Sequence, residues 1–124
     1  RMVSTGFVND DYMLSACYNA VDVYVSLSHA DNLPNTLIEA AACGIPIVCR
    51  NVGGSTEAIV PGVSGYAVAD PQEAAVAVER LLRDTSYNSI FSAAAREHAQ
   101  KYFSMDSQVL AYTALANDIA ERIR

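Results

Sequence analysis

Two carboxylates separated by seven residues, Asp31 and Glu39, flank the start of a segment whose sequence predicts a helix over residues 34–43. The first turn of a helix carries N–H groups without intrahelical acceptors and a partial positive charge. Three residues supply those first-turn amides: Asn35, Thr36 and Leu37. This end of the helix is expected to receive an anion such as a diphosphate, or a sugar oxygen. Because helical side chains lean toward the N-terminus, the Glu39 carboxylate is expected to point at the bound group.

The residues around this helix predict the elements that position it. An apolar, β-rich run over residues 21–26 predicts the preceding strand. Three residues have the chemistry of a helix start: Asp31, Asn32 and Pro34. Gly44 fits the left-handed conformation that ends many helices, and residues 47–49 are typical of a buried parallel strand. The small side chains of residues 40–42 let the helix approach the sheet, with its N-terminus at the carboxyl ends of the strands.

A glycine pair follows the strand over residues 47–49. Gly53 and Gly54 free the backbone, and their amides are expected beside the ligand, although a simple strand-to-helix turn is an alternative. Ser55 can cap the next helix, whose first turn contains Glu57. A carboxylate at that position is favourable by about 0.3–1 kcal/mol without any ligand. Glu57 could therefore serve the stability of the helix alone or contact a ligand, and both interpretations stay open.

Three stretches together resemble a known type of binding segment. They are DNLPNTLIEA over residues 31–40, ACGIPIV over residues 42–48 and GGSTE over residues 53–57. They resemble the nucleotide-sugar-binding segment of the GT4 family, retaining glycosyltransferases with two facing Rossmann-like domains (the GT-B fold). In that family two acidic residues flank seven others, a spacing that Asp31 and Glu39 share. The first acid is normally Glu, so Asp31 departs from the pattern by one methylene.

The resemblance implies roles for individual residues. Asp31 would be catalytic, through contact with the sugar hydroxyls of the donor or with the positive charge that develops at the anomeric carbon. Glu39 would hold the ribose hydroxyls. The first-turn amides and three further residues would complete the donor site: Gly53, Gly54 and Glu57. For Arg50, a surface role and a contact with phosphate both stay open, whereas for His29 a role outside the site is the preferred interpretation.

The implied activity is transfer of a hexosyl unit from a nucleoside diphosphate sugar to an acceptor hydroxyl, with retention of configuration. By resemblance, it would serve bacterial cell-surface polysaccharide or glycoconjugate assembly. No cofactor and no metal is expected, since protein groups would offset the charge of the leaving group. A glycan or lipid-linked acceptor would bind a second domain that this sequence does not contain. The resemblance implies a cytoplasmic enzyme that could work at the inner face of the membrane.

Composition excludes several other classes. The 124 residues are 52% hydrophobic and 18% charged, which indicates one packed domain. A net charge of -6 with eight scattered Lys and Arg residues argues against a nucleic-acid partner. No apolar run approaches the roughly 20 residues of a transmembrane helix. The three cysteines lack metal-ligand spacing and are expected to be reduced thiols.

Strands that alternate with helices predict an α/β fold with a parallel, doubly wound, Rossmann-like sheet. About four strands are expected, over residues 2–8, 21–26, 47–49 and 66–68. Further helices are expected over residues 12–19, 71–83, 87–102 and 105–123. The family domain has about six strands, so residues 1–124 are expected to be a single domain, the latter part of a donor-binding domain. The first strands and the acceptor domain would be absent, and the last helix would pack across both domains.

Two other function classes stay open. A sugar-nucleotide epimerase of the same architecture would convert its substrate without an acceptor. A non-catalytic α/β interaction module would tolerate substitution of Glu39. The chain alone is expected to be catalytically silent and to bind donors weakly, and it could form a homodimer through exposed sheet edges.

Overall fold

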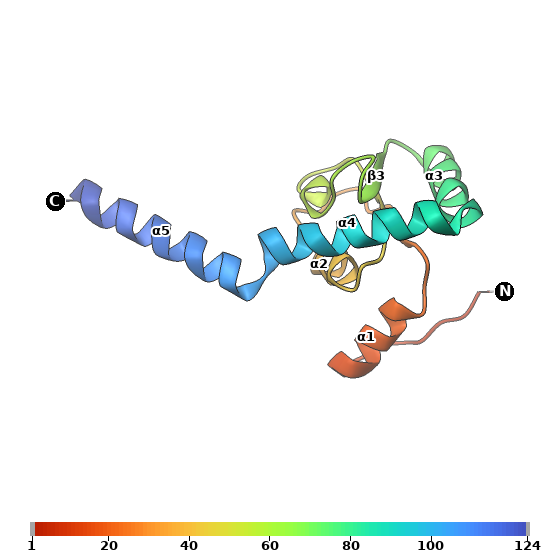
Figure 1. Cartoon of the computed structure of the whole chain (residues 1–124), viewed down its shortest axis with the longest axis horizontal. Helices are drawn as coiled ribbons and strands as arrows, with labels where there is room; N and C mark the ends of the chain where they lie inside the picture. The colour runs from red at the N-terminus through yellow and green to blue at the C-terminus, as the bar shows by residue number, and fades with distance from the viewer. Residues whose placement is uncertain (1, 124) are drawn as a thin grey trace.

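The computed structural model describes residues 2–123 (Figure 1). In chain order the elements are α1 (Asp11–Asn19), β1 (Tyr24–Ser26), α2 (Asn35–Ala42), β2 (Ile47–Arg50), the 3-10 helix η1 (Ser55–Ala58), β3 (Gly65–Val68), α3 (Pro71–Arg83), α4 (Thr85–Phe103) and α5 (Met105–Ile123). The sheet lies among α2, α3 and α4, whereas α5 runs away from this body (Figure 1).

The strands form one parallel sheet in the order β1-β2-β3. Ser26 of β1 pairs with Cys49 of β2, and Arg50 of β2 pairs with Val68 of β3. Parallel neighbours require crossover connections. Helix α2 lies in the first connection, and η1 with its flanking loops forms the second. The strands therefore end at one common edge, which is where open α/β sheets bind ligands.

Helices cover both faces of the sheet. The side chains of Ile47 and Cys49 pack in the cluster that contains α2, η1 and the second half of α4. Val48 lies between them and packs in the opposite cluster, with α3 and Phe91. Alternate residues of a strand face opposite sides, so β2 is buried on both. This arrangement confirms the predicted doubly wound, Rossmann-like α/β fold.

Local capping signals define the later helices as expected. The Asp70 side chain accepts a hydrogen bond from the N–H of Glu73, and Pro71 opens α3, which has the predicted bounds. Helix α4 begins two residues before the predicted start at Tyr87, because Asp84 caps it at Thr85. Full burial of a side chain such as Leu81 contributes about 1.5–3 kcal/mol, which holds α3 against the sheet.

Residues 2–8 contain no strand, and the prediction of a fourth strand there is wrong. Met2 and Phe7 are 97% and 92% exposed. A strand is stabilised by pairing with a neighbour, and none of the strands among residues 2–123 pairs with this segment. The sheet of the described chain therefore has three strands.

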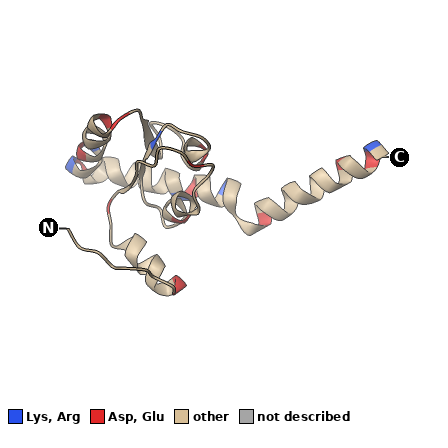
Figure 2. Cartoon of the chain, turned by 180° about the vertical axis from the view of Figure 1, so that it is seen from behind, with Lys and Arg blue, Asp and Glu red and all other residues tan. Residues whose placement is uncertain are grey.

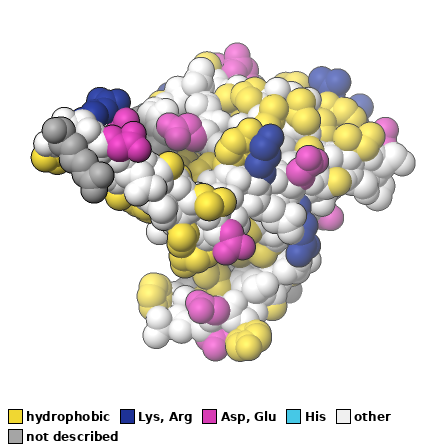
Figure 3. Space-filling model, turned by 60° about the vertical axis from the view of Figure 1, so that its left-hand side comes forward, with side chains coloured by type: hydrophobic (Ala, Val, Ile, Leu, Met, Phe, Trp, Pro, Cys, Tyr) yellow, Lys and Arg dark blue, Asp and Glu magenta, His cyan; other side chains and the backbone are white. Residues whose placement is uncertain are grey.

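Helix α5 is present with the predicted bounds, but none of its residues is buried. Its exposed apolar side chains include Met105, Val109, Leu110, Tyr112, Leu115 and Ile119. Figure 3 shows apolar side chains in several patches, between polar and charged ones, on the face turned to the viewer. Packing of α5 across two domains stays a prediction. Within residues 2–123, no helix is long and apolar enough to cross a membrane.

Charged residues are spread over the described elements (Figure 2). The basic ones are separated along the chain, as the sequence predicts. Among residues 2–123, two ion pairs, Arg83 with Glu79 and Arg122 with Asp118, join neighbouring turns of single exposed helices. Such exposed pairs contribute little to stability.

Candidate functional site

The loops that follow β1 and β2 meet at the carboxyl edge of the sheet. They line a cavity of about 480 Å³. Its lining consists of His29, Ala30, Asp31, Asn32, Val52 and Gly53. The fold thus brings two of the predicted site residues, Asp31 and Gly53, to one hollow from separate loops.

Gly53 and Gly54 allow the backbones of these two loops to touch. A Cβ atom at Gly53 would lie 1.9 Å from the carbonyl oxygen of Asp31, and one at Gly54 would lie 2.1 Å from that of Asn32. These separations are far inside van der Waals contact, so only glycine fits. Gly53 also has a φ of +51°, which disfavours other residues. The pair shapes the cavity, and contact of its amides with a ligand stays a prediction.

The N-terminus of α2 has no side-chain cap. The prediction that Asp31 and Asn32 cap this helix is wrong, because the N-cap residue is Pro34 and the loop instead packs on the glycine pair. Among residues 2–123, no hydrogen bond occupies the N–H of Asn35 or Thr36, and both residues are exposed. This helix end therefore presents free donors and the positive end of the helix dipole to a ligand.

Leu37 lies differently from its two neighbours in the first turn. Its side chain is fully buried in the core. Its N–H donates to the carbonyl oxygen of Pro34 at 3.0 Å. Leu37 therefore anchors α2 to the sheet, and its amide would have to share its proton to contact a ligand.

Glu39 lines a second cavity, of about 270 Å³, between α1 and α2. The hydroxyl of Tyr18, in α1, donates a hydrogen bond to Oε2 of Glu39 at 2.9 Å. Burial of Tyr18, and then this hydrogen bond, raise the pKa of its hydroxyl above the usual value of a tyrosine. Asp31 and Glu39 thus line two different cavities, one at the loop before α2 and the other between α1 and the second half of α2.

Glu57 lies in η1, a single 3-10 turn where the sequence predicted the start of a longer helix. Its side chain is exposed, and its Oε1 would lie 3.3 Å from a Cβ atom at Gly54. The backbone carbonyl of Glu57 accepts a hydrogen bond from Nε2 of His98 at 2.8 Å. His98 therefore joins η1 to α4.

His29 and Arg50 lie together after β1 and at the end of β2. Nη1 of Arg50 is 3.4 Å from Nε2 of His29, and since a guanidinium can only donate, the imidazole nitrogen accepts. This contact joins the loop after β1 to the end of β2. No group of three metal-ligating side chains occurs among the described residues.

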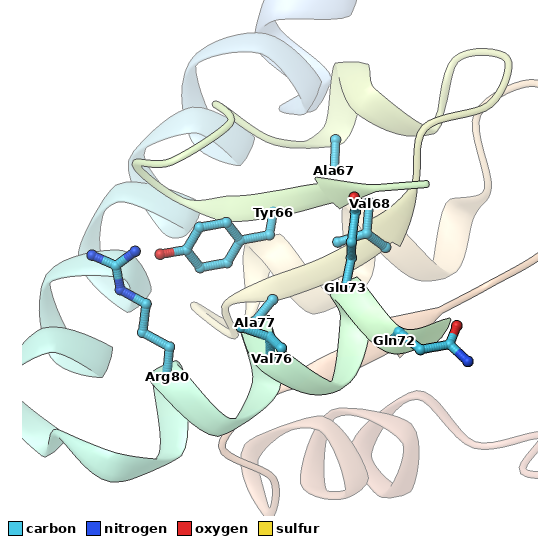
Figure 4. Close-up of a pocket in the computed structure, with 8 residues that line it drawn as sticks. All are labelled: Tyr66, Ala67, Val68, Gln72, Glu73, Val76, Ala77 and Arg80. Atoms are coloured by element: carbon cyan, nitrogen blue, oxygen red, sulfur yellow. The ribbon is translucent and has the colours of Figure 1, made fainter. Parts of the chain in front are cut away.

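A further hollow, of about 450 Å³, lies on the α3 face of the sheet (Figure 4). Its lining comes from β3 and α3, and the Tyr66 side chain points toward Arg80. The hydroxyls of Tyr66 and Tyr87 are 2.5 Å apart. None of the predicted site residues lines this hollow.

The sequence matches the family model of the glycosyl transferases group 1 over residues 1–84. The chain belongs to this glycosyltransferase family. A D-inositol 3-phosphate glycosyltransferase from Geodermatophilus obscurus is 39% identical over 113 residues, which are 87% of this chain and 24% of that relative. The chain therefore spans about a quarter of the length of this curated glycosyltransferase.

Two solved structures extend the likeness to three dimensions. A sucrose-phosphate synthase from Thermosynechococcus elongatus is similar over 89% of this chain and 28% of its own, with a TM-score of 0.79 and 28% identity. HepE from Anabaena, in complex with UDP-glucose, is similar over 81% of this chain and 29% of its own, with a TM-score of 0.70 and 25% identity. The resemblance to the GT-B glycosyltransferases is thereby confirmed for the fold as well as the family.

The structure of this glycosyltransferase chain also shows residues that the sequence motifs did not single out. Tyr18 follows Leu14 at helical spacing, which predicts a buried position and no more. Its partner, Glu39, lies on another helix, so no local pattern could identify the pair. Val52 is adjacent to the glycine pair and lines the cavity at Asp31; its place directly before two glycines was the available signal.

Proposed function

We propose that this chain is the donor-binding part of a retaining glycosyltransferase. The enzyme would transfer a hexosyl unit from a nucleoside diphosphate sugar to an acceptor hydroxyl in bacterial cell-surface polysaccharide or glycoconjugate assembly. In net terms, the bond from the anomeric carbon to the diphosphate oxygen breaks and a bond to the acceptor oxygen forms. The nucleoside diphosphate and a proton are released. The acceptor would bind a second domain that faces this one.

One observation carries this proposal: the uncapped N-terminus of α2 opens at the carboxyl edge of the sheet, with Asp31 in the loop before it and Glu39 about one turn into the helix. The free N–H groups of Asn35 and Thr36 suit phosphate or sugar oxygens. Asp31, on the exposed loop, would face the sugar and its developing positive charge. Glu39, in the cavity next to α1, would accept hydrogen bonds from the ribose hydroxyls.

The diphosphate needs compensation of its charge while the glycosidic bond breaks. The dipole and amides of α2 would supply part of this compensation. We propose that other protein groups supply the rest, so that the reaction needs no metal and no cofactor. The backbone contact of Gly53 with Asp31 would keep the loop in place during this step.

The comparisons suggest which substrates to test first. HepE was crystallised with UDP-glucose, which makes UDP-glucose the first donor to try. Relatives named for D-inositol 3-phosphate make a phosphorylated polyol the first acceptor, beside glycan acceptors.

A transfer assay tests the proposal directly. The natural full-length protein would be incubated with radiolabelled UDP-glucose or GDP-mannose and with each acceptor, and proton NMR of the product would give its anomeric configuration. We expect a labelled product that keeps the configuration of the donor. Epimerisation of the nucleotide sugar without an acceptor, or inversion at the anomeric carbon, would contradict the proposal.

A further inference from the structure

The hydrogen bond between Tyr18 and Glu39 connects α1 to the proposed donor site. We propose that Tyr18 is a positioning residue, whose hydroxyl fixes Oε2 of Glu39 and so presents the other carboxylate oxygen to the ribose of the donor. This inference rests on the proposed function, in which Glu39 holds the ribose hydroxyls. It adds α1 to the elements that set donor affinity.

The surroundings of Tyr18 give its hydroxyl one defined position. The residue is 7% exposed and belongs to the main apolar cluster with Leu37 and Ala41. Its ring packs edge-to-face on Tyr24 of β1, with centroids 5.8 Å apart. A ring held by helix, strand and core cannot follow a moving partner, so the carboxylate of Glu39 must come to the hydroxyl.

The carboxylate of Glu39 is held at one oxygen only. The terminal torsion of a glutamate is broad, so an unheld carboxylate rotates among many orientations. The Tyr18 hydroxyl takes Oε2 at 2.9 Å, and among residues 2–123 no hydrogen bond occupies Oε1. Glu39 also lines the 270 Å³ cavity beside Ser15 and Ala42. One oxygen is therefore anchored, while the other is available to a ligand in that cavity.

Tyr18 stays a donor over the range of pH in which such an enzyme works. Burial, followed by the bond to Glu39, raises the pKa of the hydroxyl above its ordinary value of 10.0. The phenol therefore remains protonated beside the carboxylate and cannot become a second anion there.

Loss of the Tyr18 hydroxyl should leave the Glu39 carboxylate present but no longer held in one orientation. In a Tyr18→Phe protein, Glu39 would still be present and charged, but it would have to be ordered each time a nucleotide binds. The effect should therefore appear in the recognition of the ribose hydroxyls, and only weakly elsewhere in the nucleotide.

The experiment compares ribose recognition in matched variants of the natural full-length protein. Calorimetry with UDP and GDP would first show which base binds more tightly. For that base, Kd would then be measured for the nucleoside diphosphate and for its 2′,3′-dideoxy form. The ratio of these two Kd values measures how much the ribose hydroxyls contribute to binding. Tyr66→Phe is the control, because it also removes a tyrosine hydroxyl and its hydrogen bond, here to the hydroxyl of Tyr87 on the α3 face of the sheet.

In the natural protein we expect the dideoxy form to bind about 10- to 150-fold more weakly, as for loss of charge-assisted hydrogen bonds. Tyr18→Phe should reduce this ratio by about three- to tenfold, whereas Tyr66→Phe should keep it. In a Glu39→Gln background, Tyr18→Phe should change the ratio by less than in the natural protein. If Tyr18→Phe lowers the melting temperature so far that binding cannot be measured, the Kd values of all variants would be compared at a lower temperature, at which Tyr18→Phe is folded.

Each result decides a separate claim. A natural protein that binds both nucleotide forms equally would overturn the role of Glu39 in the proposed function, and the role of Tyr18 with it. A full ratio in the natural protein that Tyr18→Phe leaves unchanged would overturn the role of Tyr18 alone. An equal loss in Tyr66→Phe would also overturn it, because the effect would then follow general destabilisation.

Discussion

The two cavities beside α2 are built in different ways. The cavity at Asp31 is closed by backbone on backbone, where Gly53 and Gly54 touch the carbonyl groups of the opposite loop. The cavity at Glu39 is closed by side chains of two helices and is bridged by the hydroxyl of Tyr18. The first is specified by residues whose spacing can be read along the chain. The second depends on how α1 docks, which only the folded chain shows.

The largest expected effect is on the backbone contact that closes the cavity at Asp31. Gly53→Ala would place a Cβ atom 1.9 Å from the Asp31 carbonyl oxygen, in addition to the strain of a positive φ. We expect a loss of about 2–4 kcal/mol in the free energy of unfolding, measured with urea. Gly62→Ala is the control, because its φ is +77° but nothing lies within 4 Å of the added atom.

Gly62→Ala should cost only about 1–2 kcal/mol, from the positive φ alone. Equal losses in the two variants would show that the loops separate at little cost. The backbone contact would then not be what closes the cavity at Asp31, and the contrast between the two cavities would disappear.

The next effect concerns turnover at the first cavity. Asp31→Asn removes a charge and keeps the shape of the side chain, so it should lower kcat about a hundredfold and change donor Kd little. Steady-state kinetics with calorimetry would separate the two quantities. Asp22→Asn, on an exposed residue before β1, serves as the control. An unchanged kcat together with weaker donor binding would show that Asp31 helps to bind the donor and does not stabilise the transition state.

At the second cavity we expect the opposite pattern. Glu39→Ala should weaken nucleotide-sugar binding by about 1.5–3 kcal/mol, because the ribose hydroxyls lose charge-assisted hydrogen bonds. Glu79→Ala, on the exposed face of α3, is the matched control. Titration calorimetry on both variants would measure the difference, and retention of full affinity in Glu39→Ala would remove Glu39 from the donor site.

The smallest effect uses the cysteines near the two cavities as reporters. Cys49 is fully buried, and its Sγ lies 3.7 Å from the carbonyl oxygen of Ser55. Burial raises the pKa of the Cys49 thiol from its ordinary value of 9.0 to about 11, so at pH 8 it should hold about a hundredfold less thiolate than an ordinary thiol. Cys43 lines the cavity at Glu39 and is partly exposed.

Alkylation with iodoacetamide, followed by mass spectrometry of peptides, should label Cys43 well before Cys49. Denaturant should abolish the difference. Rapid labelling of Cys49 in the folded protein would mean that the strand beneath the glycine loop opens easily, against the rigidity inferred for that region.

Much of the fold follows from local signals in the sequence. The start of α3 at residue 71 and the burial of residues 47–49 were predicted, because helix-start signals and apolar runs act over a few residues. The predicted strand over residues 2–8 failed, since a strand also needs a neighbour, and none of the described strands lies beside it. Local propensity alone could not decide this case.

In the candidate site, too, the residues in local motifs were predicted, whereas contacts between separate elements were not. The residues Asp31, Gly53 and Gly54 were predicted from motifs that resemble the GT4 donor segment, and the fold brings their loops together. The expected cap by Asp31 was wrong, because contact with Gly53 fixes the backbone of that loop in another conformation. The link from Tyr18 to Glu39 joins separate helices, and no pattern within either helix contains it.

A crystal structure of the natural full-length protein with UDP-glucose tests the central claim most directly. The account predicts the diphosphate within hydrogen-bond distance of the N–H of Asn35 or Thr36, the ribose at Glu39 and the sugar facing Asp31. A nucleotide seated instead in the hollow between β3 and α3, or bound with no contact to the start of α2, would contradict it.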